Sequence, residues 1–464
     1  MTEDLTEHLS SYEEKYRPLI RVNQDLSRQV VSYQANKDAP FYRWFRYQEG
    51  FSAKLVNLLI ADSGVKAGTV LDPFAGLGTT LLSARENDID SIGMELLPVG
   101  PFVFKARLLA EQVDITVLKA GIKELKTLTL LNMPTSTDTD FKHVRITEKA
   151  FSNDTERKLN AFRYYLEHSV TDASLREIFR FACLSILEKV SFTEKAGQFL
   201  RWDSKSGKPK AEYTKTRIYP FEAALFTQLG NMVDDLQSFW RLDPRKKQAR
   251  MDLRHGSNFE LFQEVPDRSI DLVISSPPYL NRYDYTRVYP LELAFLGVDE
   301  MQIRQLRQSL LTCTVENREK IDFLKNLYAT RGNLARFERA VDAFNSIELL
   351  SHIIKTFDEF KQNEKLNNSN VFRLIKNYFF EHSFIIHEMA RVLKDGGKIY
   401  YINDNVRFAG IVIPVDIILS EIAIKAGLRV KTIFKLPIGK GNSSQQMGTY
   451  GKEEVRKCIY VWEK

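Results

Sequence analysis

The segment 69–80, TVLDPFAGLGTT, constrains the fold of this chain more than any other stretch. A short apolar run with strand character leads into a turn with glycines at 76 and 78, and the following residues have helical character. Because glycine has no Cβ, Gly76 and Gly78 let a ligand approach the backbone, and the helix N-terminus offers free N–H groups. The segment has neither the Gly-Lys-Ser/Thr of a P-loop nor the full GxGxxG of a dinucleotide site.

An acidic residue follows at the end of the next predicted strand. Glu95 lies at the end of the strand within SIGMEL, and from that position a carboxylate can hydrogen-bond both hydroxyls of a ribose. The order strand, glycine turn, helix, strand and acid predicts a nucleoside-cofactor site at the carboxyl edge of a parallel sheet. The alternative is a tight turn that binds no ligand.

The alternation of strand and helix marks three separate parts of the chain. It covers 41–125 and returns at 251–296 and 371–464, which predicts one α/β domain with a mostly parallel sheet. Long, charge-laced helices fill 126–250 and 297–370 as two insertions, and 1–40 is polar and helical.

Composition sets the remaining limits. The net charge of +6 permits a polyanionic partner without requiring one. Three cysteines lie far apart and form no Cys/His cluster, which argues against a metal site and for a reducing compartment. The N-terminus is no signal peptide and no run is long enough to span a membrane, so we expect a cytoplasmic protein of unknown oligomeric state.

A second motif, ISSPPY at 274–279, ends the apolar strand IDLVI. Two prolines remove two backbone donors, so this turn presents carbonyl oxygens, with the hydroxyl of Ser276 as a further acceptor. Acceptors on a rigid turn suit an exocyclic amine, and Tyr279 offers a flat face for a heteroaromatic base. The alternative is a stiff loop beside a core aromatic residue.

Together, DPFAGLGTT and SSPPY resemble the two principal motifs of the amino-group DNA methyltransferases, which use S-adenosylmethionine. Looser similarities at RWFRYQEGFSAKLVNLLI, HGSNFELFQEVPDRSIDLV and ARVLKDGGKIYYIND extend the resemblance to about half of the chain. SPPYLNRYDYTRVYPLELAFLG resembles a bacterial subgroup of site-specific enzymes that often methylate cytosine at N4. The resemblance implies a Rossmann-like methyltransferase sheet with two largely helical insertions.

The resemblance also implies roles for individual residues. Ser276 and the Pro277 carbonyl would accept hydrogen bonds from the target amine, Pro278 would stiffen the turn, and Tyr279 would stack on a flipped-out base. The cofactor would contact Asp72, Phe74, Gly76, Gly78, Thr79, Thr80 and Glu95. Where the family commonly has Gly-Asp before the catalytic motif, this chain has Gly256-Ser257-Asn258, so Asn258 is the substitute for the adenine contact. A serine before Pro-Pro favours cytosine-N4 over adenine-N6.

The insertion at 126–250 is the candidate target-recognition region for double-stranded DNA. Its polar loop carries six basic residues that could contact phosphates: Arg201, Lys205, Lys208, Lys210, Lys215 and Arg217. The insertion at 297–370, with arginines at helical spacing, is a rival, and both basic runs could be solvated surface. The resemblance suggests a restriction–modification or phage-defence system with a cognate endonuclease or another defence subunit. An RNA amino-group methyltransferase and an inert DNA-binding subunit are the alternative functions.

Overall fold

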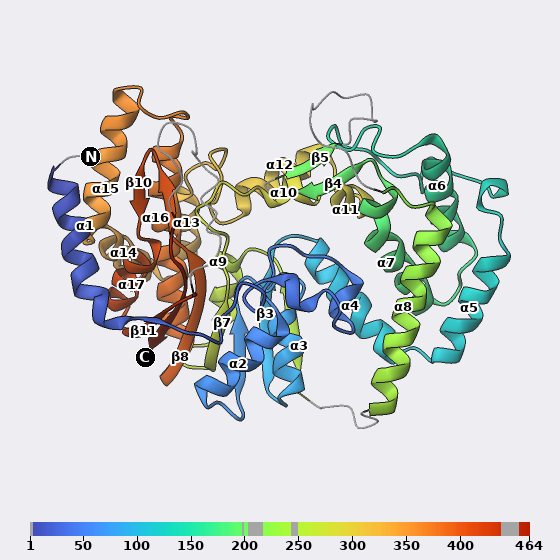
Figure 1. Cartoon of the computed structure of the whole chain (residues 1–464), viewed down its shortest axis with the longest axis horizontal. Helices are drawn as coiled ribbons and strands as arrows, with labels where there is room; N and C mark the ends of the chain where they lie inside the picture. Colours follow the sequence, from blue (N-terminus) through green and yellow to red (C-terminus); the bar gives the residue numbers. More distant parts are fainter. Residues whose placement is uncertain (1–2, 197–198, 203–216, 243–248, 438–453) are drawn as a thin grey trace.

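The centre of the molecule is an eight-stranded sheet, which we describe from a computed structural model covering residues 3–196, 199–202, 217–242, 249–437 and 454–464 (Figure 1). Its strand order is β1-β11-β12-β8-β7-β2-β3-β6. Of the paired neighbours in this sheet, β12 runs antiparallel to both β11 and β8, and the other pairs are parallel. The strands are β1 Ile20–Val22, β2 Thr69–Asp72, β3 Asp90–Glu95, β6 Met251–His255, β7 Ile270–Ser275, β8 Leu393–Asp404, β11 Arg429–Lys435 and β12 Lys457–Glu463. The predicted mostly parallel α/β fold is confirmed.

Both faces of the central strands are buried, as apolar runs without alternation predict. Val70 of β2 packs into one hydrophobic cluster, whereas its neighbour Leu71 packs into another on the opposite face. Along β7, Leu272 and Ile274 join the first cluster and Val273 joins the second. This division follows from the two-residue period of a strand, so one apolar run supplies both cores.

Helices cover the two faces. The first cluster takes side chains from α2 (Ala53–Ser63) and α3 (Thr79–Glu86), and the second from α16 (Val371–Val392) and α17 (Val415–Lys425). The N-terminal segment contains α1 (Glu3–Tyr16) and adds the short strand β1 to the sheet. No helix among the described residues has the length and apolarity that crossing a membrane requires.

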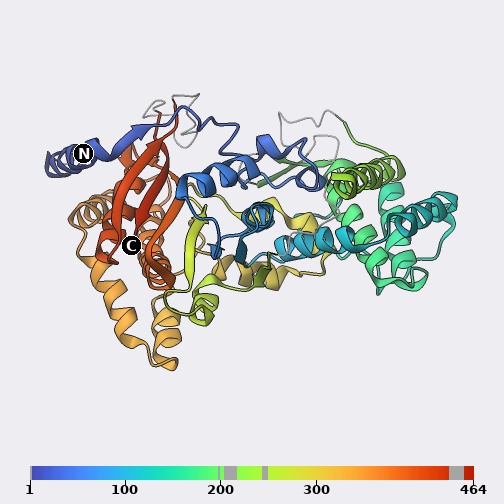
Figure 2. The same ribbon diagram turned by 90° about the horizontal axis from the view of Figure 1, so that it is seen from below.

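The two insertions form helical bodies on opposite sides of the sheet domain (Figures 1 and 2). One contains α6 (Asn153–His168), α7 (Ala173–Val190) and α8 (Phe221–Leu242), against which α4 (Val99–Gln112) and α5 (Ile115–Thr127) pack. It also carries the hairpin of β4 (Thr193–Ala196) and β5 (Phe199–Trp202). The other contains α13 (Ile321–Thr330), α14 (Leu334–Asn345) and α15 (Glu348–Gln362). Helix α12 (Glu300–Ser309) lies apart from these three helices, and its buried Ile303 packs in the hydrophobic cluster of the first body (Figure 1). Shorter elements are α9 (Asn258–Leu261), α10 (Tyr285–Val288), α11 (Pro290–Phe295), β9 (Val406–Phe408) and β10 (Ile411–Ile413).

The chain order of the strands determines where a ligand can bind. From β2 the chain proceeds outward through β3 to β6, and then returns to place β7 on the other side of β2. The connections that follow β2 and β7 therefore run in opposite directions away from each other. Because they separate at this point, they leave a crevice at the carboxyl ends of β2 and β7. The two sequence motifs follow these two strands directly.

Candidate active site

The glycine turn after β2 is fastened to the end of β3. Gly76 and Gly78 have φ angles of 53° and 77°, in the left-handed region that glycine adopts at little cost. The N–H of Ala75 donates to the carbonyl of Met94 at 2.9 Å. A Cβ on Gly78 would lie 2.5 Å from the ring of Phe104, so this position has no room for a side chain.

Glu95 holds the turn from the side. Its carboxylate oxygens accept hydrogen bonds from the backbone N–H groups of Gly76 at 2.8 Å and Leu97 at 2.7 Å. Burial raises the pKa of Glu95 from 4.5 to about 7, although these N–H groups act in the opposite direction. The carboxylate therefore has a fixed orientation at the edge where a ribose is expected.

Asp72 connects the two sequence motifs. Its buried carboxylate accepts hydrogen bonds from Ser275 at the end of β7 and from Thr80 in α3, both at 2.6 Å, and from the N–H of Phe74 at 3.1 Å. Burial raises the pKa of Asp72 from 3.8 to about 6. Ser275 is fully buried, and its hydroxyl is bound to Asp72.

A cavity opens over this turn at the carboxyl ends of β2 and β7. Five of the predicted cofactor residues line it: Phe74, Gly76, Thr79, Glu95 and Asn258. The side-chain amide of Asn258 donates to the carbonyl of Pro73 at 3.4 Å. The other three, Asp72, Gly78 and Thr80, lie behind the cavity wall, where they support the turn.

The SPPY turn lies at the edge of the same cavity. Ser276 Oγ donates to the hydroxyl of Tyr279 at 3.1 Å, so the lone pairs of Ser276 remain as acceptors. Ser276 and Pro278 line the cavity beside the glycine turn. Burial, and to a lesser degree the carboxylate of Asp404, raises the pKa of Tyr279, so the tyrosine is neutral at physiological pH.

A second cavity adjoins the first on the other side of the SPPY turn. Ser276, Pro277 and Tyr279 form part of its wall. Five residues line both cavities: Tyr33, Glu49, Gly50, Ser276 and Tyr285. The crevice thus has two compartments joined at Ser276.

Sequence reasoning missed several residues of this site. Glu49 accepts hydrogen bonds from the hydroxyls of Tyr283 and Tyr289, which follow the SPPY motif. Gly100 lies so close to the glycine turn that a Cβ would be 2.3 Å from the carbonyl oxygen of Gly76. The closely spaced tyrosines of NRYDYTRVY were a usable signal, whereas the close approach of Gly100 has no sequence signature.

Two of the six basic residues predicted to bind DNA lie in described parts of the chain. Arg201 is on β5, and the exposed Arg217 packs its guanidinium over the ring of Tyr219 at 4.4 Å. Lys205, Lys208, Lys210 and Lys215 lie outside the described residues. The assignment of these six residues to DNA binding stays a prediction.

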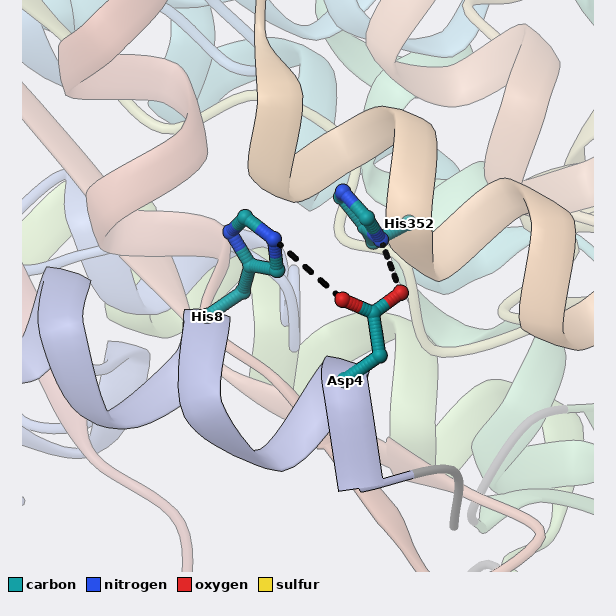
Figure 3. A group of neighbouring side chains, drawn as sticks. All are labelled: Asp4, His8 and His352. Carbon is teal, nitrogen blue, oxygen red and sulfur yellow. Dashed lines mark ion pairs between the residues drawn. The ribbon is translucent and has the colours of Figure 1, made fainter.

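Away from the crevice, Asp4 and His8 of α1 meet His352 of α15 (Figure 3). The Asp4 carboxylate lies 3.6 Å from His8 Nε2 and 2.9 Å from His352 Nδ1, and the imidazoles stack with 3.8 Å between centroids and 26° between planes. A ring nitrogen binds a metal in the plane of its own ring, so nearly parallel rings are poorly aimed at a shared ion. The arrangement suits an ion pair that fastens α1 to α15. The expectation of no metal site stays a prediction.

Comparison with known proteins identifies the family. The sequence model of a family described as DNA methylase, of the N6/N4 type, matches residues 10–98. The chain is 39% identical to the type II methyltransferase M.AvaI of Nostoc sp. and of Anabaena variabilis, covering 100% of this chain and 94% of the relative. It is 36% identical to M.BsoBI of Geobacillus stearothermophilus, covering 97% and 91%. No solved structure matches. With its glycine turn and SPPY turn at one crevice, this chain belongs to the amino-group (N6/N4) DNA methyltransferases.

Proposed function

We propose that this protein methylates the exocyclic N4 of cytosine in double-stranded DNA and is the methyltransferase of a type II restriction–modification system. The observation that carries the choice of base is Ser276 before Pro277-Pro278-Tyr279, at the junction of the two cavities. The relatives are named type II methyltransferases, and full-length similarity to them supports the assignment of the system. A cognate restriction endonuclease is the partner this implies.

The first cavity suits S-adenosylmethionine, which supplies an activated methyl group when it is bound. It lies at the carboxyl edge of the sheet, where α/β proteins bind nucleosides, and Gly76 leaves the backbone open to a ligand. Glu95 would bind the ribose hydroxyls through lone pairs that its two backbone donors leave free. Phe74, Thr79 and Asn258 would complete the contacts.

The second cavity is the proposed site of the target base. An amine nitrogen in a base is a weak nucleophile because its lone pair is delocalised into the ring. Ser276 Oγ and the Pro277 carbonyl can accept its two hydrogens and favour a tetrahedral nitrogen, while Tyr279 stacks on the ring. Because the base lies inside the duplex, it must first be flipped out, at a cost of a few kcal/mol.

Two surfaces are candidates for holding the duplex. The first is the predicted basic region, with Arg201 on β5 and Arg217 between β5 and α8. The second is α12, where Arg304 is exposed in a groove and the residues Ser309–Leu311 at its end line the first cavity. Arginines beside the proposed cofactor cavity would contact phosphates close to the flipped base.

Three other functions make different predictions. An adenine-N6 enzyme would use the same turn, and an RNA enzyme would use a similar pocket. An inert subunit would keep only the fold. We would incubate the protein with labelled S-adenosylmethionine and duplex DNA, tRNA or buffer alone, and digest the product to nucleosides. Label in N4-methylcytosine is the expected result. Label in N6-methyladenine, label in tRNA alone, or no incorporation would each overturn the proposal in favour of the corresponding alternative.

A further inference from the structure

Glu49 occupies the junction of the two cavities. It follows the short 3-10 helix Tyr42–Trp44 and precedes α2, in a loop that covers the crevice. Among the described residues, it is the carboxylate that lines both cavities. Glu95 lines the first cavity and Asp404 the second, where Asp404 is paired with Lys457 at 2.9 Å. Glu49 therefore lies where a methyl group would pass from one compartment to the other.

Two tyrosines fix the orientation of this carboxylate. The hydroxyl of Tyr283 donates to one oxygen of Glu49, and the hydroxyl of Tyr289 donates to the other. Tyr289 also accepts the N–H of Gln48 at 3.2 Å and stacks on Tyr47 with 5.1 Å between ring centroids. Each carboxylate oxygen has a further lone pair, so the group is positioned but still able to accept another hydrogen.

Methylation of an exocyclic amine requires a proton acceptor. As the nitrogen–methyl bond forms, the sulfur–methyl bond breaks and its electron pair returns to sulfur, which leaves an extra positive charge on the nitrogen. One of the two N–H protons must then leave. The Ser276 hydroxyl and the Pro277 carbonyl can hold these hydrogens, but neither retains a proton, because their protonated forms are strong acids. A carboxylate can retain it.

Resting on the proposed function, we propose that Glu49 is the proton acceptor of the methyl-transfer reaction. The charges balance, because a carboxylate, a sulfonium and a neutral amine become a carboxylic acid, a thioether and a neutral methylamine. Glu49 is thereby a catalytic residue supplied by the loop before α2, opposite the SPPY turn.

The surroundings of Glu49 suit this role. Burial raises its pKa from 4.5 to about 7, against the lowering effects of the Tyr289 hydroxyl and of Lys195 and Arg46. Lys195 is itself paired with Glu292 at 2.5 Å, and Arg46 is exposed. A sulfonium in the first cavity would lower the proton affinity of Glu49 before transfer, and its conversion to a thioether would restore that affinity afterwards. The hydroxyl groups of Tyr47 and Tyr285 also lie close to Glu49, and burial raises the pKa of both.

Cofactor binding tests this placement without requiring turnover. We would measure the affinities of S-adenosylmethionine and S-adenosylhomocysteine by calorimetry between pH 5.5 and 8.5. The two ligands differ in the methyl group and the sulfur charge, so their affinity ratio isolates the effect of the sulfonium. The affinity for S-adenosylmethionine divided by that for S-adenosylhomocysteine should fall as pH decreases and Glu49 becomes protonated. The total fall should be about tenfold for each unit by which the sulfonium lowers the pKa of Glu49. In Glu49→Gln the change of the ratio with pH should be much smaller, and what remains belongs to Glu95, whose pKa is also raised and which lines the same cavity. A flat ratio in the unmodified protein, or the same slope in Glu49→Gln, would overturn the proposal.

Single-turnover methylation tests the chemical role. With saturating cofactor and DNA at pH 8, Glu49→Gln should methylate roughly 100-fold more slowly or worse, while its cofactor affinity changes only a few-fold. The control is Glu260→Gln, an exposed carboxylate on α9 outside both cavities, which should keep the normal rate. A normal rate in Glu49→Gln, above all with a large loss in Asp404→Asn, would reassign the proton to Asp404. If the unmodified protein methylates no DNA, the proposed function fails, and the affinity ratio still decides whether Glu49 faces the sulfonium.

Discussion

Replacing Gly100 by alanine should damage the cofactor site through a single methyl group. An added Cβ would lie 2.3 Å from the carbonyl oxygen of Gly76 and 2.7 Å from Cγ of Glu95, and real Cβ atoms essentially never come closer than 3.0 Å to another heavy atom. Helix α4 and the glycine turn must therefore separate by about 0.7 Å at this contact, and a packed interior has little slack for such a shift.

Two free-energy terms act in opposite directions. Alanine is preferred over glycine within a helix by about 0.5 to 1 kcal/mol, and somewhat less in a first turn such as that of α4. Overpacking a rigid contact costs about 1 to 3 kcal/mol. Because the clash is with backbone rather than with a flexible side chain, we expect a net loss of about 1 to 2 kcal/mol in the free energy of unfolding. Displacement of Gly76 and Glu95 should weaken cofactor binding at least tenfold, or about 1.4 kcal/mol.

Gly230 provides the matched control. It is exposed on α8, and a Cβ there would meet nothing within 4 Å. Gly230→Ala should therefore stabilise the protein by about 0.5 to 1 kcal/mol and leave cofactor affinity unchanged. Urea unfolding and calorimetry with S-adenosylmethionine measure both quantities. If Gly100→Ala behaves like Gly230→Ala in both assays, the close contact between α4 and the turn is not real.

Three further substitutions test other parts of the site. Tyr279→Ala should reduce methylation by 100-fold or more, while calorimetry shows cofactor binding within a few-fold of normal, and near-normal turnover would remove Tyr279 from the site. Besides the decreases that the raised pKa values of Glu49 and Glu95 add at somewhat higher pH, Asp72 alone should lower the free energy of unfolding by about 2 to 3 kcal/mol as pH rises from about 4 to 6, because its ionisation becomes favourable in the unfolded chain before it does in the folded one. Asp72→Asn should lack this decrease in urea titrations, and an identical pH profile would contradict the raised pKa of Asp72. Arg304→Ala should weaken DNA binding and lower the slope of log affinity against log salt by about 1, and an unchanged slope would exclude a phosphate contact.

Local patterns were sufficient to predict the fold. The strand, glycine turn and helix around Gly76, and the apolar strand before Ser276, depend on residues that are neighbours in the sequence. The alternation of buried side chains along β7 and the left-handed φ angles of the glycines depend on local sequence. The sequence could therefore identify both motifs and the edge of the sheet at which they lie. Placing β12 antiparallel between β8 and β11 needed the structure, because pairing direction has no local signature.

The connections within the site were not predictable in this way. Asp72 binds Ser275 across 203 positions, and Glu49 binds Tyr289 across 240 positions. A single sequence does not indicate which of many carboxylates meets which hydroxyl after folding. Asp72 was expected to contact the cofactor as part of the turn motif, and only its three hydrogen bonds reveal a supporting position behind the cavity wall.

The most direct measurement concerns the methylated nucleoside itself. DNA from a host without its own DNA methylation would be isolated after expression of this chain, digested, and separated by chromatography with mass detection. We predict N4-methylcytosine, absent when Ser276 is replaced by alanine in a folded protein. N6-methyladenine in its place would contradict the assignment of cytosine, and unmodified DNA together with intact cofactor binding would contradict the proposed methyltransferase activity.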